Sequence, residues 1–141
     1  MYTGSCLCGG VQFAVEGELE SIQVCHCSQC RKAQGGPFAT NLPVAASAFR
    51  LVSGEALLTA FRASADKERV FCGRCGSPIF SRRDNLPDVV RVRAGLIDEP
   101  LSARPAAHFN TASKSSWWPI ADDLPQHPDD YLPPVVGRGT D

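Results

Sequence analysis

Seven cysteines constrain what this sequence can fold into more than any other feature, because all of them fall into three short clusters. The clusters are Cys-x-Cys at 6–8, Cys-x-Cys-x-x-Cys at 25–30 and Cys-x-x-Cys at 72–75. An odd number of cysteines argues against a disulfide framework, whereas thiols at these spacings are typical of metal sites. The pattern therefore predicts metal binding, and the alternatives are a redox-active cysteine cluster and ordinary packing.

The size and charge of the chain limit the classes of protein to which it can belong. Its 141 residues fit one domain, and 43% are hydrophobic and 21% charged, as in an ordinary globular domain. The formal net charge of -1 provides no basic field for nucleic acid or anionic lipid. The first residues, MYTGSCLCGG, lack the features of a signal peptide, and no apolar run is long enough to span a bilayer. We therefore expect a cytoplasmic protein without nucleic-acid or membrane partners.

Short strand patterns separated by turns dominate the sequence. Alternating or β-branched runs predict strands near residues 11–15, 49–52, 57–61, 69–71 and 90–94. One short helix is expected from Ser28, as its N-cap, to Gln34, because the Gly-Gly-Pro that follows would stop it. Twelve glycines and eleven prolines are too many for a helical bundle. The sequence thus predicts a mainly β domain of short antiparallel sheets with little helix, followed by a proline-rich tail at 129–141.

The seven cysteines divide naturally into four and three, because a structural zinc site takes four ligands. Cys6 and Cys8 are two residues apart, so both thiols would lie on one face of an extended segment. Cys72-Gly-Arg-Cys75-Gly has the form of a zinc knuckle, in which the glycine after each cysteine lets the turn bend toward a metal. Together the two halves predict a closed four-cysteine site; two unrelated turns are the alternative.

The remaining cysteines, Cys25, Cys27 and Cys30, predict a zinc site with an open position. Three protein ligands and a vacant fourth place are typical of a catalytic zinc. His26 lies between two of these cysteines, but in an extended segment its side chain points away from theirs. We therefore expect a substrate to supply the fourth ligand, and we leave open whether His26 is packed, exposed or a proton shuttle.

Several other residues have both a functional and a structural interpretation. Arg31 and Lys32 directly follow the open site and would either bind a carboxylated substrate or remain solvated at a helix end. For His108 we expect a hydrogen-bonded structural histidine rather than a general acid or base. Trp117 and Trp118 are adjacent, so we expect one ring to pack inward and the other outward.

The cysteine clusters and their neighbours resemble the glutathione-dependent formaldehyde-activating enzyme family, whose domain is shared with centromere protein V. The matching segments are 4–11 (GSCLCGGV), 25–32 (CHCSQCRK) and 71–76 (FCGRCG), with weaker similarity at 92–98 (VRAGLID), 117–118 (WW) and 122–125 (DDLP). The resemblance covers residues 3–128, which it identifies as one zinc domain. It implies a β-tent fold, in which small sheets lean together with zinc between them.

The resemblance also implies the ligand sets and the reaction. The structural zinc would be held by Cys6, Cys8, Cys72 and Cys75, and the catalytic zinc by Cys25, Cys27 and Cys30, giving about two zinc ions per chain. The activity implied is that of a carbon–sulfur lyase that joins formaldehyde to glutathione, giving S-hydroxymethylglutathione. Its partners would be a small thiol such as glutathione and a small aldehyde. Three thiolates on Zn²⁺ leave a net negative charge, which favours thiol delivery over activation of the aldehyde by the metal.

Two rival functions remain beside the enzyme. A non-catalytic zinc-stabilised binding domain is possible because centromere protein V shares the pattern, and a metal-free redox relay at 25–30 would form reversible disulfides. A nucleic-acid or microtubule partner would require a basic extension, but the tail carries Asp129, Asp130 and Asp141 against Arg138. This charge balance favours the enzyme. The oligomeric state stays open.

Overall fold

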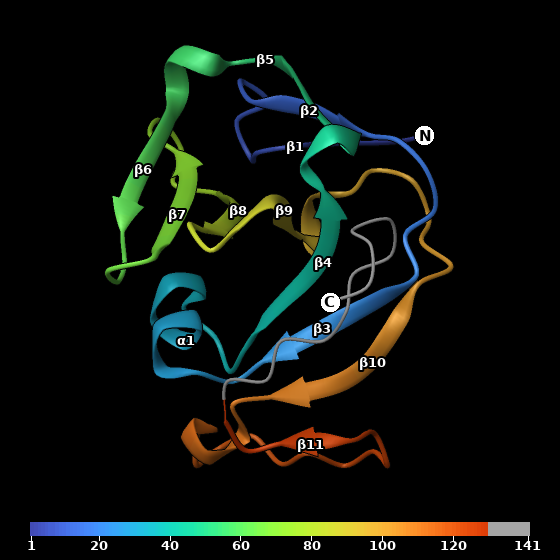
Figure 1. The fold of residues 1–141 in the computed structure, drawn as a ribbon, viewed down its shortest axis with the longest axis vertical. Coiled ribbons are helices and arrows are strands. Elements are labelled where there is room, and N and C mark those ends of the chain that lie inside the picture. The colour runs from blue at the N-terminus through green and yellow to red at the C-terminus, as the bar shows by residue number, and fades with distance from the viewer. Residues whose placement is uncertain (130–141) are drawn as a thin grey trace.

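The computed structural model describes residues 1–129, in which short strands form two sheets (Figure 1). The smaller sheet is antiparallel with the order β1-β2-β5 and contains β1 (Tyr2–Ser5), β2 (Gln12–Val15) and β5 (Phe49–Ser53). The larger sheet has the order β11-β10-β3-β4-β9-β8-β7-β6. Its strands are β3 (Ser21–Cys25), β4 (Ala39–Ala45), β6 (Leu58–Arg62), β7 (Lys67–Cys72), β8 (Pro78–Arg83), β9 (Leu86–Arg93), β10 (Arg104–Phe109) and β11 (Gln126–His127).

The strand pairing confirms the predicted mainly β fold class and adds one feature to it. Most neighbours are antiparallel, but β10 runs parallel to both β3 and β11. The smaller sheet lies at one end of the molecule, and β10 and β11 lie at the other (Figure 1). The predicted strands overlap β2, β5, β6, β7 and β9.

Helix α1 (Ser28–Gln34) has the predicted extent but a different N-cap. The capping residue is Cys27, whose Sγ accepts a hydrogen bond from the Cys30 backbone N–H at 3.2 Å, so Ser28 is the first helical residue. The helix ends at Gly35, whose φ of 69° is in the left-handed region that glycine adopts without strain. In Figure 1, α1 lies near the end of β3 and the start of β7.

The main hydrophobic core joins the two sheets. Its fully buried side chains include Phe13, Leu42 and Ile79, and Phe13 stacks on Phe49 with ring centroids 5.2 Å apart. Cys72 belongs to this core, together with Cys6 of the first cluster. Burying one such large apolar side chain contributes roughly 1.5–3 kcal/mol, so this core is a large favourable contribution to folding.

A row of buried polar side chains crosses the larger sheet, and we call it the buried polar row. Its members are Gln23, Asn41, Arg69, Ser81, Arg91 and Arg93, each at most 8% exposed. They are neighbours in register, since Gln23 pairs with Asn41, Asn41 with Arg93, Ser81 with Arg91 and Arg69 with Ser81. An alternating strand such as 90–93 usually turns its polar side to water. Here the polar side of the sheet is buried instead. Arg69, on the neighbouring part of the sheet, donates to Cys30 Sγ at 3.5 Å, so the cysteine cluster beside α1 lies against this side of the sheet.

Two sequence predictions concern regions at the limits of the structure. Within residues 1–129, no helix combines the length and apolar character needed to cross a bilayer. The predicted proline-rich tail lies outside the described residues except for Asp129, and the domain boundary at 128 stays a prediction.

Candidate metal centres and the adjoining pocket

Four cysteines from distant parts of the chain converge beside the main core. The Sγ atoms of Cys6, Cys8, Cys72 and Cys75 all lie within 4.8 Å of one another. Cys8 Sγ is 3.5 Å from Cys6 Sγ and 3.9 Å from Cys72 Sγ, although 64 positions separate Cys8 from Cys72. Four thiolates about 2.3 Å from one tetrahedral zinc ion would lie about 3.8 Å apart, so the spacing of these sulfurs fits zinc.

Turns, and not an extended segment, bring these thiols together. β1 ends at Ser5, and the backbone then turns so that Gly9 N–H donates to the Cys6 carbonyl at 3.1 Å. The expectation that Cys6 and Cys8 share the face of a strand is therefore wrong, although their thiols do meet. The Cys6 thiolate would be stabilised by the Val11 N–H, which donates to its Sγ at 3.3 Å.

The second half of this group is a knuckle whose two glycines have different roles. Gly76 has φ of 81° and its N–H donates to the Cys72 carbonyl at 2.8 Å, so it provides the left-handed bend that was expected. Gly73 is not among the residues with positive φ; a Cβ there would lie 2.5 Å from Thr59 Oγ1, so this glycine is required for space. The expected bend at both glycines is thus correct only at Gly76.

Polar neighbours of the four-cysteine group favour the thiolate form of Cys8 and Cys75. Arg74 Nε donates to Cys8 Sγ at 3.3 Å. A backbone hydrogen bond from Gly10, followed by this bond from Arg74, lowers the pKa of Cys8. A hydrogen bond with the Ser77 hydroxyl, 3.3 Å away, lowers the pKa of Cys75 to about 5. Such donors offset the negative charge that four thiolates leave on a divalent cation.

The other three cysteines form a second group where β3 meets α1. The Sγ atoms of Cys25, Cys27 and Cys30 lie within 4.8 Å of one another, and Cys30 is 1% exposed. Together with Ala39 they make a small cluster separate from the main core. Asn110 Nδ2 donates to Cys25 Sγ at 3.4 Å. The structure therefore brings together the three predicted sulfur ligands, and a soft metal such as zinc suits this donor set.

Cationic side chains compensate the charge of the three-cysteine group. Hydrogen bonds from Cys25 and then Cys27 lower the pKa of the Cys30 thiol, and Lys67 and Arg69 lower it further. Hydrogen bonds from Cys27 and Cys30, together with burial, raise the pKa of Cys25. Arg93 is buried nearby, and burial lowers its pKa to about 10, which leaves it charged at neutral pH. The surroundings thus stabilise negative charge on sulfur.

His26 points away from the sulfurs and into a hydrogen-bonded chain. Asp122 is a carboxylate and can only accept, so His108 Nε2 donates to its two oxygens, at 3.0 and 3.1 Å. His108 Nδ1 lies 2.8 Å from His26 Nε2, so the two rings are joined by a hydrogen bond. His26 is fully buried, and burial lowers its pKa to about 4. Both histidines therefore hold the end of β3 against β10 and the segment at 122.

A pocket of about 370 Å³ opens at the three-cysteine group. Cys25 and Cys27 form part of its wall, together with Ser28 and Gln29 at the start of α1. The rest of the wall is mostly polar and consists of Gln23, Asn41, Ser64, Asp66, Lys67, Arg83, Arg91, Phe109 and Asn110. Three cations and one carboxylate therefore face a ligand that approaches these sulfurs.

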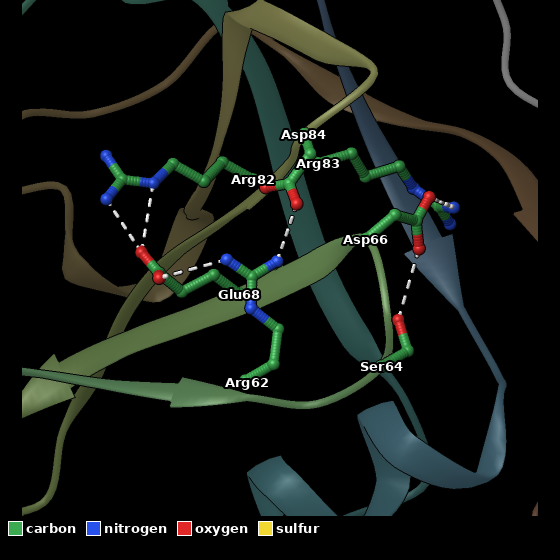
Figure 2. Close-up of polar contacts among 7 residues, drawn as sticks. All are labelled: Arg62, Ser64, Asp66, Glu68, Arg82, Arg83 and Asp84. Carbon is green, nitrogen blue, oxygen red and sulfur yellow. Dashed lines mark hydrogen bonds and ion pairs between the residues drawn. The ribbon is translucent and has the colours of Figure 1, made fainter.

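An ion-pair network joins β6, β7 and β8 (Figure 2), and two of its residues, Asp66 and Arg83, line this pocket. Figure 2 shows Arg62 between Glu68 and Asp84, at 3.7 and 2.8 Å, and Asp66 paired with Arg83 at 3.8 Å. Each exposed pair contributes at most about 1 kcal/mol. The pair that bears on the pocket is Asp66 with Arg83, because both residues line its wall.

The residues proposed from sequence to bind substrate lie elsewhere. Arg31 and Lys32 are in the last turn of α1 and do not line the pocket, and Arg31 Nε donates to the Ser113 carbonyl at 3.1 Å. Their role in substrate binding stays a prediction. The expectation for the tryptophans is wrong, because Trp117 is 64% and Trp118 40% exposed. These residues lie at a turn, where the inward and outward alternation of a strand does not apply.

Sequence analysis did not identify the cations around the pocket. Lys67 begins β7 and Arg83 ends β8, so the antiparallel pairing of these strands places the two residues opposite each other. Arg91 comes from a third strand, β9. Only the sheet register brings the three cations together. The alternating Val-Arg-Val-Arg at 90–93 was the available signal. This pattern would have predicted the cations only if the arginine side of the strand had been known to face the cysteines.

Comparisons with known proteins agree with the cysteine geometry. The family model described as glutathione-dependent formaldehyde-activating enzyme matches residues 1–113. A protein of Halomonas elongata provisionally named a glutathione-dependent formaldehyde-activating enzyme is 34% identical over 122 residues, which cover 81% of this chain and 77% of that protein. An uncharacterized lyase of Schizosaccharomyces pombe is 28% identical over 95 residues, 67% of each chain. A crystal structure of a Rhodobacter sphaeroides protein matches 74% of this chain and 99% of the Rhodobacter chain, with a TM-score of 0.61. The two sequences are 23% identical, so this similarity supports the fold alone.

Proposed function

The chain belongs to the glutathione-dependent formaldehyde-activating enzyme family, and on this basis we propose that it joins a glutathione-type thiol to formaldehyde at the Cys25, Cys27 and Cys30 group. In this reaction the thiol sulfur bonds to the carbonyl carbon, the carbonyl π bond breaks, and the thiol proton ends on the oxygen. The reverse reaction breaks the carbon–sulfur bond, which is the reaction of a carbon–sulfur lyase. No oxidant or reductant is needed in either direction.

One observation carries the proposal: of the two cysteine groups, the three-cysteine group opens into the pocket of about 370 Å³. Cys25 and Cys27 line that pocket, whereas Cys6, Cys8, Cys72 and Cys75 do not. This difference supports a structural role for the four-cysteine group and a reactive role for the other. Pockets for small ligands have volumes of about 300–1,000 Å³, so a tripeptide thiol is of suitable size.

We assign one zinc ion to each cysteine group. When bound at Cys25, Cys27 and Cys30, zinc supplies a coordination position at which an incoming thiol loses its proton. Three thiolates and one divalent cation already carry a net charge of about −1, so an anionic fourth ligand needs further positive charge nearby. Lys67, Arg69 and Arg93 are close enough to influence the group electrostatically and would offset the charge of a further thiolate.

The pocket wall supports glutathione as the thiol. Glutathione carries two carboxylates and one ammonium group. Lys67, Arg83 and Arg91 would bind the carboxylates, and Asp66 would accept a hydrogen bond from the ammonium group. The sulfur would then lie toward Cys25 and Cys27, which line the same pocket.

The test of this function is exchange spectroscopy with the zinc-loaded protein. Formaldehyde labelled with ¹³C and glutathione reach equilibrium with their adduct, and NMR measures the rate of exchange between free and sulfur-bound formaldehyde. We expect the protein to raise this rate above the spontaneous one and Cys27→Ser to remove the increase. If the rate equals that of a zinc blank, the proposed reaction is wrong.

A pair of lysine variants tests the assignment of the substrate site. Lys67→Gln removes a cation from the pocket wall, and we expect it to raise the glutathione concentration for half-maximal rate by about tenfold or more, as for loss of one charged hydrogen bond. Lys32→Gln is the matched control, since Lys32 lies outside the pocket. A larger effect from Lys32→Gln would favour the binding role predicted from sequence for the end of α1.

Cobalt substitution separates the enzyme from the non-catalytic binding domain. Thiolate-to-cobalt absorption depends on the number of bound sulfurs, so glutathione should increase it if the thiol joins Cys25, Cys27 and Cys30. An unchanged band, together with an unaccelerated exchange rate, would support a binding domain whose metals only stabilise the fold.

A further inference from the structure

Asn110 has the least usual backbone conformation in the part of the chain that the structure describes. Its φ of 57° and ψ of 40° are left-handed, and within residues 1–129 it is the one residue other than glycine with positive φ. Most side chains are disfavoured in this conformation, which asparagine adopts more readily than other residues. Asn110 directly follows Phe109, the last residue of β10, which pairs in register with Cys25. This residue therefore lies beside the three-cysteine group.

The left-handed turn brings the Asn110 side chain to the wall of the cysteine pocket. In an extended strand neighbouring side chains point to opposite faces, yet Phe109 and Asn110 both line this pocket. The Phe109 carbonyl accepts from the His26 backbone N–H at 2.8 Å, which holds the end of β10 against the cysteine segment. From this position Asn110 Nδ2 donates to Cys25 Sγ at 3.4 Å. Because a thiolate can only accept, the nitrogen of the amide and not its oxygen suits this contact.

Each sulfur of the three-cysteine group accepts a hydrogen bond from a different kind of donor. Cys27 Sγ accepts from the backbone N–H of Cys30 at 3.2 Å, and Cys30 Sγ accepts from Arg69 Nη2 at 3.5 Å. Cys25 Sγ accepts from the Asn110 amide. The first donor belongs to α1 and the second to a buried arginine of β7, so both also support the fold. Asn110 is a half-buried residue at a turn, so its amide is the donor whose removal disturbs the fold least.

We propose that Asn110 is a positioning residue for the zinc ion at Cys25, Cys27 and Cys30. Its amide orients the Cys25 sulfur and offsets part of the negative charge that three thiolates leave on a divalent cation. Loss of such a partner of a metal ligand typically lowers metal affinity by about 10- to 100-fold. The inference rests on the zinc ion of the proposed function, but not on the reaction with formaldehyde. The alternative is a purely structural role at the turn before the 3₁₀ helix Thr111–Ser113.

Two variants of Asn110 separate the amide from the turn. Asn110→Gly removes the amide, whereas the backbone turn is retained because glycine adopts the left-handed conformation readily. Asn110→Asp keeps the size of the side chain and a residue type tolerated at positive φ, but replaces the donor by a carboxylate that repels the Cys25 thiolate. Asn85→Gly makes the same chemical change at the exposed turn between β8 and β9, and it is the matched control.

Competition with a zinc-binding dye, on the zinc-loaded full chain, measures the affinity of the zinc ion that Cys27→Ser lacks. We expect Asn110→Gly to lower this affinity by about tenfold or more, and Asn110→Asp to lower it further. Asn85→Gly should leave the affinity unchanged. All three variants should retain the zinc ion of the four-cysteine group, which shows that they are folded.

The cobalt-substituted protein gives a second readout, which a purely structural role would not change. A hydrogen bond to sulfur stabilises the sulfur lone pairs, so the loss of this bond in Asn110→Gly should move the thiolate-to-cobalt absorption to longer wavelength. The proposal is overturned if Asn110→Gly has the zinc affinity and cobalt band of the unchanged protein, or if Asn85→Gly lowers the affinity equally. The proposed reaction would survive either result. If the unchanged protein binds zinc only at the four-cysteine group, this inference and the zinc-dependent reaction are both wrong.

Discussion

The two cysteine groups should differ sharply in their contribution to stability, and two Cys→Ser variants measure the difference. Cys75 belongs to the four-cysteine group and Cys27 to the three-cysteine group, and both are half-buried. The two variants are therefore matched in chemistry and exposure. Serine is also a good N-cap, so Cys27→Ser retains the cap of α1.

The expected magnitudes follow from the segments that each group connects. A link between Cys8 and Cys72 closes a loop of 64 residues, which constrains the unfolded chain by about 4 kcal/mol. The three-cysteine group closes a loop of about five residues, for which the same relation gives about 2 kcal/mol. Structural zinc contributes on the order of 10 kcal/mol to folding in small domains, whose total stability is about 5–15 kcal/mol. We therefore expect Cys75→Ser to lose at least about 4 kcal/mol or to unfold, and Cys27→Ser to lose at most about 2 kcal/mol.

Urea unfolding followed by far-ultraviolet circular dichroism measures both losses, and metal analysis of the same samples shows which zinc has been lost. Unchanged protein should contain about two zinc ions per chain. Cys27→Ser should retain one zinc ion and a cooperative transition. Equal losses of stability in the two variants, or a folded Cys75→Ser that keeps two zinc ions, would refute this division of roles.

Two further predictions concern a glycine and a histidine. Gly54→Ala should destabilise the fold by at least about 2 kcal/mol in urea unfolding, because φ is 91° and a Cβ would lie 2.7 Å from Val11 Cα and closer still to the Gly10 carbonyl oxygen. Gly17→Ala, with φ of 86° but open space around it, should cost only about 1 kcal/mol, and equal costs of the two variants would contradict the steric argument. The pKa of buried His26 is about 4 against a usual 6.5, so the unfolded chain binds a proton at this histidine before the folded one does. The free energy of unfolding should therefore fall by up to about 3 kcal/mol as the pH drops from 6.5 to 4. His26→Gln should lack this loss, and parallel pH profiles for the two proteins would exclude His26 as its source.

The sequence predicted the cysteine groups because their chemistry is local and countable. Spacings of two and three residues identify half-sites, and four-fold coordination then pairs the first cluster with the third. The helix from Ser28 to Gln34 was predictable for a similar reason, since the residues that stop it are adjacent. What failed was the detail of the backbone around Cys6, where a turn replaces the expected strand.

Long-range pairing limited the rest of the prediction. β4 carries Pro43, which pairs with Arg91 of β9 but lies beyond the residues of β4 that pair with β3, and sequence rules disfavour proline inside a strand. β10 contains Pro105 and alanines, and it pairs in parallel with β3 at a separation of about eighty residues. The cations beside Cys25 likewise come together only through the pairing of β7, β8 and β9. No local pattern contains that information.

The buried polar row and the three-cysteine group explain each other's presence inside the fold. A buried guanidinium without a negative partner is costly, and so is a group of thiolates whose charge exceeds that of its metal. Arg69 donates to Cys30 Sγ, and Arg93 contributes favourably to the same sulfur at longer range, so each charge lowers the cost of burying the other. An alternating valine–arginine strand is therefore compatible with a buried position in a cysteine-rich domain.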